Sequence, residues 1–229
     1  MKNYIGGKAW KQEKYEHILD KGFALFAERG IEQVKLSEVA KAADVGNATL
    51  YRYFPTKTDL VVAIAARKWQ EFTKWYNSPE YSGGTENLTG AEYLKFFFDS
   101  FLELYRNHKD ILRFNYDFNS FVGSTEWTQE QKQPYLQMVD ALGTQFHELY
   151  ERGTKDGTLN TDIPEHTMFS STFHIMLAAV TRYAIGLAVV NSSNPESELV
   201  MLAEMMLTRF TDNADKGLQT DFYREEKTK

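Results

Sequence analysis

The sequence predicts an all-α protein of about nine helices. Almost no segment alternates between apolar and polar residues with the period of two that is typical of a strand. Nearly every apolar pattern has the helical period instead. The composition is that of a globular chain, because 42% of the 229 residues are hydrophobic and 25% are charged. We therefore expect an amino-terminal unit of three helices followed by a larger helical body.

The first helix is expected over residues 10–29. Its apolar face repeats at intervals of three and four residues, and consists of Tyr15, Ile18, Leu19, Gly22, Phe23, Phe26 and Ala27. Gly30 stands where many helices end on a left-handed residue, and Ile31 can pack back against Phe26. These signals place the end of the helix at about residue 29.

Two short helices are expected next, over residues 36–42 and 47–53. The first would turn Leu36, Val39 and Ala40 inward, and the tight connection Asp44-Val45-Gly46 follows it. Aspartate tolerates the left-handed conformation better than most residues, so Asp44 can form this turn. Pro55 ends the second short helix.

A fourth helix is expected to start near residue 57 and run toward Trp75. Thr56 and Asp59 have the spacing of a capping box, in which each side chain accepts a hydrogen bond from the other residue's backbone N–H. We place the domain boundary here. Residues 1–56 would form the first domain and residues 57–229 the second, with the fourth helix as the connector.

The body is expected to begin with a loop over residues 77–90, which contain Pro79, Gly83 and Gly84. Further helices are predicted over residues 92–107, 111–121, 128–153, 163–190 and 195–213. Asp162 and Asn194 would be N-caps, with Pro164 and Pro195 in the opening turns. The last eleven residues are expected to be a solvated tail.

Composition excludes several classes of protein. The chain contains no cysteine, so it has no disulfide, cysteine nucleophile or thiolate metal site. The five histidines show no zinc-binding spacing, and no phosphate loop, dinucleotide fingerprint or G-x-S-x-G motif is present. No secretory signal is visible, and the most apolar stretch, residues 175–190, is too short and too charged for a membrane span. We expect a cytoplasmic protein that is not an enzyme and has no cofactor or metal.

The charge is unevenly distributed. Residues 1–75 hold 13 Lys and Arg against 9 Asp and Glu, which gives +4, whereas the whole chain carries −6. The remaining residues therefore carry −10. A basic amino-terminal third on an acidic body indicates that a polyanion would meet only the first part of the chain.

Residues 36–53 have the spacing of a helix-turn-helix, in which the second helix enters the DNA major groove. Leu50 would anchor that helix in the core, and Arg52 could bind guanine and Asn47 adenine through paired hydrogen bonds. Ala48 and Thr49 could contact a thymine methyl group. The residues suited to phosphate oxygens are Lys35, Tyr51, Tyr53 and Lys57. The alternative is a helical hairpin that serves only packing.

Four runs of residues in the amino-terminal third form a recognisable pattern. They are Phe26-Ala27-Glu28-Arg29-Gly30, Leu36-Ser37-Glu38-Val39-Ala40, Ala43-Asp44-Val45-Gly46 and Thr49-Leu50-Tyr51-Arg52-Tyr53-Phe54-Pro55-Thr56-Lys57-Thr58-Asp59-Leu60. This pattern closely resembles the DNA-binding domain of the TetR-like (tetracycline-repressor) family, and the resemblance covers about 50 residues, from Ile18 to Ala66. The chain departs from the family pattern at Lys35, which replaces a capping Thr, and at Asp44 and Gly46, which replace Gly and Ser.

The resemblance implies a homodimeric transcription factor, usually a repressor, that binds a palindromic operator in double-stranded DNA. The residues that match its reading helix are Asn47, Ala48, Thr49, Tyr51, Arg52 and Tyr53, and Lys57 matches a phosphate-binding lysine. The last two long helices would pair with those of a second subunit in a four-helix bundle. An effector bound inside the body would change the separation of the two reading heads.

The body is rich in aromatic residues, which would suit an apolar or aromatic small-molecule effector. The candidate effector-binding residues are Phe97, Phe101, Tyr105, Phe114, Phe118, Asn119, Phe146, His147, Phe173 and Met176. Three apolar helix faces contribute to this set, and their convergence would either line a cavity or fill a core. A DNA-binding adaptor whose body binds a protein is the alternative to an effector-responsive repressor.

The last two helices carry the features of an interface. Apolar residues recur at helical spacing from Leu199 to Phe210, and small residues on the preceding helix, up to Ala188, allow close approach. The predicted dimer-interface residues are Ala179, Gly186, Leu199, Leu202, Met206 and Phe210. The alternative is that these faces pack within one subunit.

Overall fold

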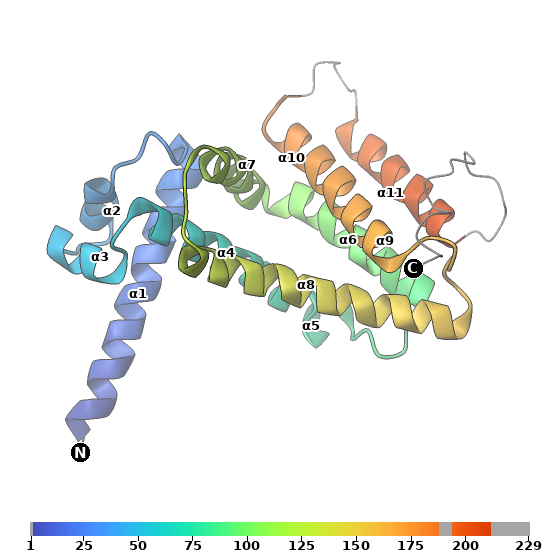
Figure 1. Ribbon diagram of the computed structural model, residues 1–229, viewed down its shortest axis with the longest axis horizontal. Helices are drawn as coiled ribbons and strands as arrows, with labels where there is room; N and C mark the ends of the chain where they lie inside the picture. Colours follow the sequence, from blue (N-terminus) through green and yellow to red (C-terminus); the bar gives the residue numbers. More distant parts are fainter. Residues whose placement is uncertain (1, 188–193, 212–229) are drawn as a thin grey trace. The chain divides into compact units, whose positions relative to one another are not determined.

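The computed structural model describes residues 2–187 and 194–211, and this part of the chain is helical without a strand (Figure 1), which confirms the all-α prediction. The helices are α1 (Lys2–Arg29), α2 (Leu36–Ala42), α3 (Asn47–Tyr53), α4 (Lys57–Tyr76), α5 (Pro79–Ser82), α6 (Gly90–Asn107), α7 (Lys109–Ser124), α8 (Gln129–Asp156), α9 (Glu165–Thr172), η1 (Phe173–Leu177), α10 (Ala178–Ala184) and α11 (Pro195–Thr211). Among the described helices, none is long and apolar enough to cross a bilayer.

Packing divides the chain into two compact units. Of the described residues, 2–76 and 108–140 form the first unit, and 77–107, 141–187 and 194–211 form the second. The first unit therefore includes α7 and the beginning of α8 together with α1 to α4. A domain boundary between residues 56 and 57 remains a prediction about function, because units defined by packing need not coincide with functional domains.

The helix α1 ends where the sequence predicts but starts earlier. Gly30 has a φ of 86°, and its N–H donates to the carbonyl of Phe26 at 2.9 Å. The predicted start at residue 10 is wrong, since the helix begins at Lys2. The first nine residues include Gly6 and Gly7 and continue no apolar face, so periodicity gives no signal for a helix there.

The helices α2 and α3 have the predicted bounds, and the turn between them depends on Asp44. This residue adopts a φ of 51°, and among described residues other than glycine it alone has a positive φ. After α3, the backbone of Phe54 is extended, with a φ of −133°. Thr56 and Asp59 form the predicted capping box, with bonds of 2.8 Å to Asp59 Oδ2 and 3.2 Å to Thr56 Oγ1.

The core of the first unit forms where α1 packs against α2, α4 and α7 (Figure 1). The predicted inner residues Val39, Ala40 and Leu50 are buried, whereas Leu36 is half-buried. A methyl group on Gly22 would lie 2.8 Å from Ile64 Cδ1, so α1 and α4 pack closely at this glycine.

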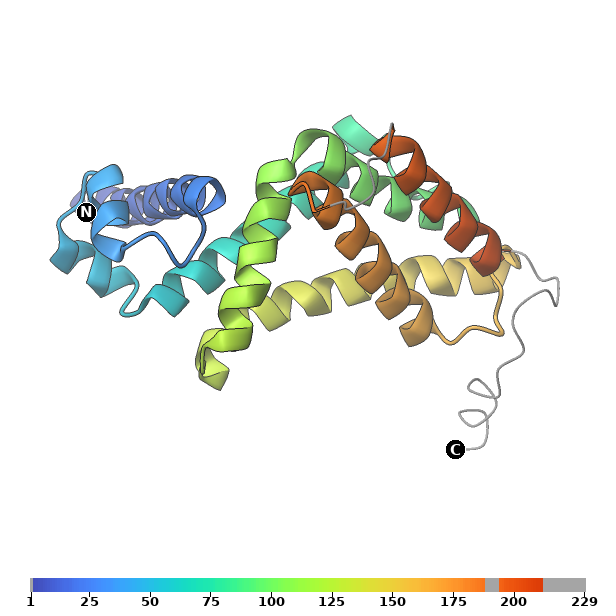
Figure 2. The ribbon, with the colours of Figure 1, turned by 90° about the horizontal axis from the view of Figure 1, so that it is seen from above.

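The second unit places α6 against both α10 and α11, which lie beside it in Figures 1 and 2. The expected loop over residues 77–90 contains the short helix α5, which Pro79 opens and Gly83 ends with a φ of 69°. The helices α6, α7 and α8 each extend by a few residues beyond the predicted ranges.

The predicted continuous α-helix over residues 163–190 is wrong. The segment is interrupted by the π-helical turn η1 and ends at Ala184, because Gly186 adopts a φ of 76°. Pro164 stands at the N-cap position of α9, and the expected cap Asp162 instead donates its N–H to Asn160 Oδ1 at 3.0 Å.

The start of α11 agrees with the prediction. Asn194 Oδ1 accepts a hydrogen bond from the N–H of Ser197 at 3.2 Å, and Pro195 opens the helix. The inferences drawn for Ala188, for the helix ends at residues 190 and 213, and for the carboxyl-terminal tail lie outside the described residues.

Candidate nucleic-acid interface

The helix α3 exposes one face and anchors the other. Leu50 is fully buried, whereas Asn47, Ala48, Tyr51 and Arg52 are exposed. Two further candidates, Thr49 and Tyr53, are half-buried. The exposed set offers an amide, a methyl group, a phenol and a guanidinium, which together are the groups that read base edges and hold phosphates.

Tyr53 and Lys57 also have structural contacts within the first unit. The Tyr53 hydroxyl donates to the carbonyl of Lys11 at 3.3 Å, and Lys57 Nζ donates to the carbonyl of Glu32 at 3.2 Å. Burial lowers the pKa of Lys57, while Glu32 and Glu38 oppose that shift. The two residues fix the ends of α3 and α4, and their contacts with phosphate remain predictions.

The start of α2 is capped without a side-chain oxygen at Lys35. Glu38 reaches back, and its Oε2 accepts the N–H of Lys35 at 2.9 Å, while Oε1 pairs with Arg29 at 2.8 Å. The bond from the Lys35 N–H, followed by the bond from Arg29, lowers the pKa of Glu38. Lys35 itself stays exposed. The sequence signal for this contact is a glutamate three residues after the cap position.

A further contact that sequence analysis did not predict lies at the start of α4. Gln131, in the first turn of α8, donates from Nε2 to Asp59 Oδ1 at 2.9 Å and to Thr56 Oγ1 at 3.3 Å. Gln131 therefore binds the same two side chains that cap α4. Residues more than 70 positions apart form this contact, so local spacing contains no sign of it.

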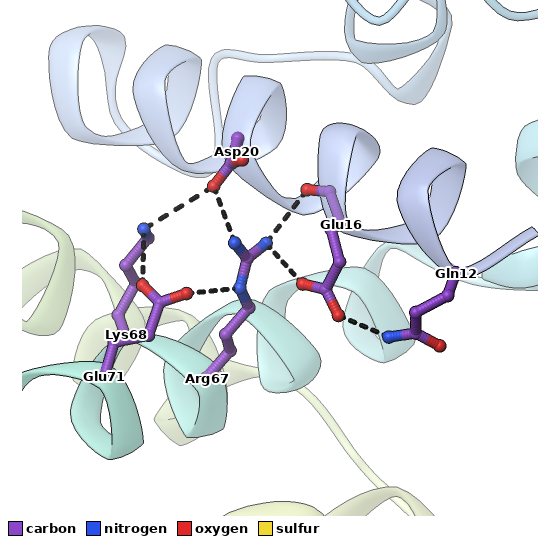
Figure 3. A network of polar contacts seen from close by, with 6 residues as sticks. All are labelled: Gln12, Glu16, Asp20, Arg67, Lys68 and Glu71. Carbon is purple, nitrogen blue, oxygen red and sulfur yellow. Dashed lines mark hydrogen bonds and ion pairs between the residues drawn. The ribbon is translucent and has the colours of Figure 1, made fainter. Parts of the chain in front are cut away.

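An ion-pair network joins α1 to α4 and holds the two helices in register (Figure 3). The guanidinium of Arg67 contacts three carboxylates: Nη1 lies 2.9 Å from Glu16 Oε2, Nη2 lies 3.0 Å from Asp20 Oδ1, and Nε lies 2.6 Å from Glu71 Oε1. Lys68 adds a contact of 2.9 Å to Glu71. Burial alone would raise the pKa of Glu71, but Lys68 and Arg67 bring it below its ordinary value.

The predicted effector-binding residues fall into two separate groups. Phe97 packs on Phe101, Phe146 and Phe173 in the second unit, with ring centroids 5.4–5.8 Å apart. Phe169, which is not among the candidate effector-binding residues but lies on the same predicted helix face as Phe173, joins this cluster with its ring centroid 4.8 Å from that of Phe173. We call these five phenylalanines the aromatic cluster. Met176 is fully buried in the same unit, and Tyr105 is half-buried there.

The other predicted effector-binding residues do not join the aromatic cluster. Phe114 and Phe118 are buried in the first unit. The ring centroid of Phe114 lies 5.6 Å from that of Phe23, and the ring centroid of Phe118 lies 5.0 Å from that of Tyr135. Asn119 is exposed on α7. His147 is also exposed, and it pairs with Glu165 at 3.0 Å. Phe114 and Phe118 were grouped with the other phenylalanines because helix periodicity predicts which face of a helix is apolar, but it does not predict which other helix covers that face.

The predicted interface residues are also divided by burial. Leu199, Met206 and Phe210 are buried within the chain, and Phe210 stacks on Phe98 at 6.3 Å, so they are not surface residues. Ala179 and Leu202 are half-buried, and Gly186 is exposed. The large exposed apolar side chains in this part of the chain are Ile175 in η1, Leu187 after α10, and Met201 and Met205 in α11, none of which the periodicity argument selected.

The comparisons with known proteins agree with this geometry. Residues 18–64 match the family model described as bacterial regulatory proteins, tetR family. The transcriptional repressor KstR of Mycolicibacterium smegmatis is 36% identical over 81 residues, which cover 35% of this chain and 39% of that protein. The chain thus spans less than half the length of the curated relatives that it matches first.

Two solved structures share the fold over most of the chain. The fatty acid degradation regulator FadR from Bacillus halodurans gives a TM-score of 0.65 at 19% identity, covering 85% of this chain and 94% of its own. FadR from Bacillus subtilis, solved in complex with stearoyl-CoA, gives a TM-score of 0.63 at 19% identity, covering 87% of this chain and 99% of its own. At these identities the likeness shows the fold.

The matched family consists of regulatory proteins, in agreement with the prediction that the chain is not an enzyme. The family model covers the residues that carry the resemblance in the sequence, including α2, the turn at Asp44 and α3. The chain is therefore TetR-like, and its residues 18–64 form a domain of the tetR family of bacterial regulatory proteins.

Proposed function

We propose that this chain is a homodimeric, sequence-specific DNA-binding repressor that a small, largely apolar effector releases from its operator. The observation that carries the proposal is the face of α3, on which Asn47, Ala48, Tyr51 and Arg52 are exposed while Leu50 is fully buried. A short helix anchored in this way can enter the major groove without disturbing the core beneath it.

The exposed residues divide into two roles. Arg52 can donate two hydrogen bonds to guanine, and Asn47 can pair with adenine, so these residues would determine sequence preference. Lys35, Tyr51, Tyr53 and Lys57 would bind phosphates and thereby fix the register of the helix on the duplex. The excess of basic residues over residues 1–75 supports this assignment, because it concentrates positive charge in the first part of the chain.

Dimerisation would present two copies of α3 to a palindromic operator. The support comes from α11, where Met201 is 56% exposed and Met205 is 61% exposed. Ile175 in η1 adds a third exposed apolar side chain. Large side chains of this kind are costly to leave in water, and pairing with a second copy would bury them.

The proposed effector site is the aromatic cluster. Its rings come from α6, α8, α9 and η1, and Phe169 and Phe173 are only half-buried. An apolar ligand could pack against these partly exposed rings. The B. subtilis relative solved with stearoyl-CoA makes this molecule a suitable first probe. As a repressor of bacterial type, the protein would act in the cytoplasm.

The first experiment is selection of bound duplexes from a random DNA library by the purified protein, at two salt concentrations. We expect an enriched palindrome whose affinity falls steeply as salt rises, because phosphate contacts release counterions. If no sequence is enriched, the selection is repeated after the protein has been unfolded, stripped of ligand and refolded. A second failure would contradict the proposal.

The effector is tested with the selected duplex and stearoyl-CoA. We expect the ligand to lower the affinity for DNA, and Phe173→Ala to weaken that effect without changing DNA affinity in the absence of ligand. The matched control is Tyr116→Ala, which truncates an exposed aromatic residue in the first unit. Equal release of DNA from the Phe173 variant and the wild type would contradict the assignment of the aromatic cluster.

A further inference from the structure

We propose that the amino-terminal part of α1 forms a second DNA-binding surface, in which Lys11 and Lys14 bind phosphates beside the bases that α3 reads. We call this surface, formed by Trp10, Lys11 and Lys14, the α1 surface. The inference rests on the proposed function, since it assumes that α3 binds the major groove. Its occupant is the phosphodiester backbone of the same duplex.

The α1 surface is continuous with the end of the reading helix. The hydroxyl of Tyr53, the last residue of α3, donates to the carbonyl of Lys11 at 3.3 Å. Tyr15 packs beside this bond, with its ring 6.1 Å from that of Tyr53 and 5.1 Å from that of Phe54. These contacts fix residues 11–15 next to α3, and α1 continues from there toward the amino terminus (Figure 1).

Charges on α1 are sorted between two sides of the helix. Gln12, Glu16 and Asp20 follow one another at intervals of four, and Glu16 and Asp20 bind Arg67 of α4 (Figure 3). With about 100° of rotation per residue, Lys14 lies roughly 160° around the helix from Glu16. The carboxylates that face α4 are therefore compensated there. Of the three carboxylates in residues 10–21, only Glu13 stays outside this network.

The opposite side carries an aromatic and basic stripe. Trp10, Lys14, His17 and Lys21 recur at intervals of four, three and four residues, so they lie along one side of α1. Trp10, His17 and Lys21 are exposed, and Lys14 is half-buried.

Trp10 holds Lys14 in place without cancelling its charge. The side chain of Trp10 is 55% exposed, and Lys14 Nζ lies 3.9 Å from the centroid of its ring. A cation over an aromatic face is attracted to the ring but keeps its full positive charge, unlike a lysine bound to a carboxylate. The ammonium of Lys14 and the exposed Lys11 thus remain available to a polyanion. An aromatic ring beside two ammonium groups is suited to a sugar-phosphate backbone.

The test uses the full-length protein and the duplex obtained by selection. The variant Lys11→Gln/Lys14→Gln should bind this duplex about tenfold more weakly at low salt, since two phosphate contacts are lost. The slope of log affinity against log salt concentration should become shallower by about 2. Base preference should not change, because the α1 surface contacts no base edge.

The matched control is Lys74→Gln/Lys95→Gln, which removes the same charge from exposed lysines outside the α1 surface. This control should bind like the wild type. Hydroxyl-radical footprinting should show that the Lys11/Lys14 variant loses protection of the DNA backbone beside the bases that α3 reads, whereas the control keeps it.

The outcomes separate this inference from the proposed function. If the wild type binds the duplex selectively and both double variants have the same affinity and salt slope, the α1 surface is not a DNA-binding surface, although the proposed function stands. If the wild type itself selects no sequence, both are wrong. A circular dichroism melt checks that the Lys11/Lys14 variant is folded, which we expect because both substitutions lie outside the core.

Discussion

At the scale of single residues, Arg52 is the side chain on which sequence preference is expected to depend most. It is exposed, and its guanidinium carbon lies 5.8 Å from the centroid of the Tyr53 ring. We predict that Arg52→Ala lowers the affinity for the selected duplex by about 1–3 kcal/mol and relaxes base preference at one position. Fluorescence anisotropy with duplexes substituted at each position measures both effects.

The control for this prediction is thermal stability. Because Arg52 is exposed and Leu50 anchors α3, the melting temperature of the Arg52→Ala variant should stay close to that of the wild type. A variant that binds weakly but keeps the full base preference would show that Arg52 binds phosphate instead of guanine.

His147 provides a second prediction at this scale. Its hydrogen bond to Glu165, helped by the charge of that carboxylate, raises the pKa of His147. A pKa raised by folding means that the pair stabilises the protein fully at pH values below the unfolded pKa. This contribution is lost as the pH rises through the folded pKa.

We expect nuclear magnetic resonance to give a pKa for His147 above its ordinary value of about 6.5. The substitution Glu165→Gln should bring the pKa of His147 back down, because it removes the main cause of the shift. If the pKa is the same in both proteins, the pair observed at 3.0 Å does not persist in solution.

At the scale of helices, local chemistry explains which elements could be predicted. The bounds of α2 and α3 follow from Asp44 and Pro55, which interrupt a helix through backbone conformation alone. The cap formed by Thr56 and Asp59 is equally local. The sequence was less informative where no local signal exists: residues 2–9 of α1 continue no apolar face, and the interruption at η1 lies where the helix packs against α6 and α11.

The candidate sites follow the same division. The exposed face of α3 could be predicted, since a single buried residue, Leu50, orients a short helix. The aromatic residues of the body were correctly identified as apolar helix faces. However, Phe114 and Phe118 meet α1 and the start of α8, while Phe97 and Phe101 meet α8 and η1. Only the tertiary structure determines these partners.

The crossing of α6 and α8 leads to a stability prediction. A methyl group on Gly90 would lie 2.0 Å from the Cα atom of Gly153, so the two backbones are in direct contact. We predict that Gly90→Ala destabilises the protein by about 3 kcal/mol or more, because backbone atoms cannot move aside as a flexible side chain can. Chemical denaturation measures this change.

Gly143, also in α8, is the matched control. Nothing lies within 4 Å of the methyl group that Gly143→Ala would add, and alanine favours helix by about 0.5–1 kcal/mol over glycine. The control variant should therefore be slightly more stable than the wild type. Similar free energies of unfolding for the Gly90→Ala and Gly143→Ala variants would show that α6 and α8 do not cross at Gly90 and Gly153.

At the scale of the whole molecule, the central prediction concerns self-association. We expect Met201→Glu/Met205→Glu to convert the protein to a monomer with unchanged helical content, because the new charges would face each other in the dimer. Operator affinity should also fall, since two linked reading heads bind more tightly than one. Analytical ultracentrifugation and anisotropy measure the two effects.

The comparison for this variant is Leu136→Glu, which places a charge on an exposed apolar residue of α8 in the first unit. It should leave the association state unchanged. If the double methionine variant sediments like the wild type, the second copy binds elsewhere or not at all.

The π turn η1 has a consequence for how this molecule tolerates insertions and deletions. Met168, Thr172, Met176 and Val180 are all fully buried, and they recur at intervals of four. Over these three intervals a regular α-helix would carry the buried side about 120° around its axis. The extra residue of a π turn takes back about 100° of this rotation. Deleting one residue within Phe173–Leu177 would thus leave a regular α-helix in which α10 keeps the same side buried, because eleven residues of α-helix turn through nearly the same angle as these twelve residues do. The segment is therefore expected to tolerate a one-residue deletion within η1.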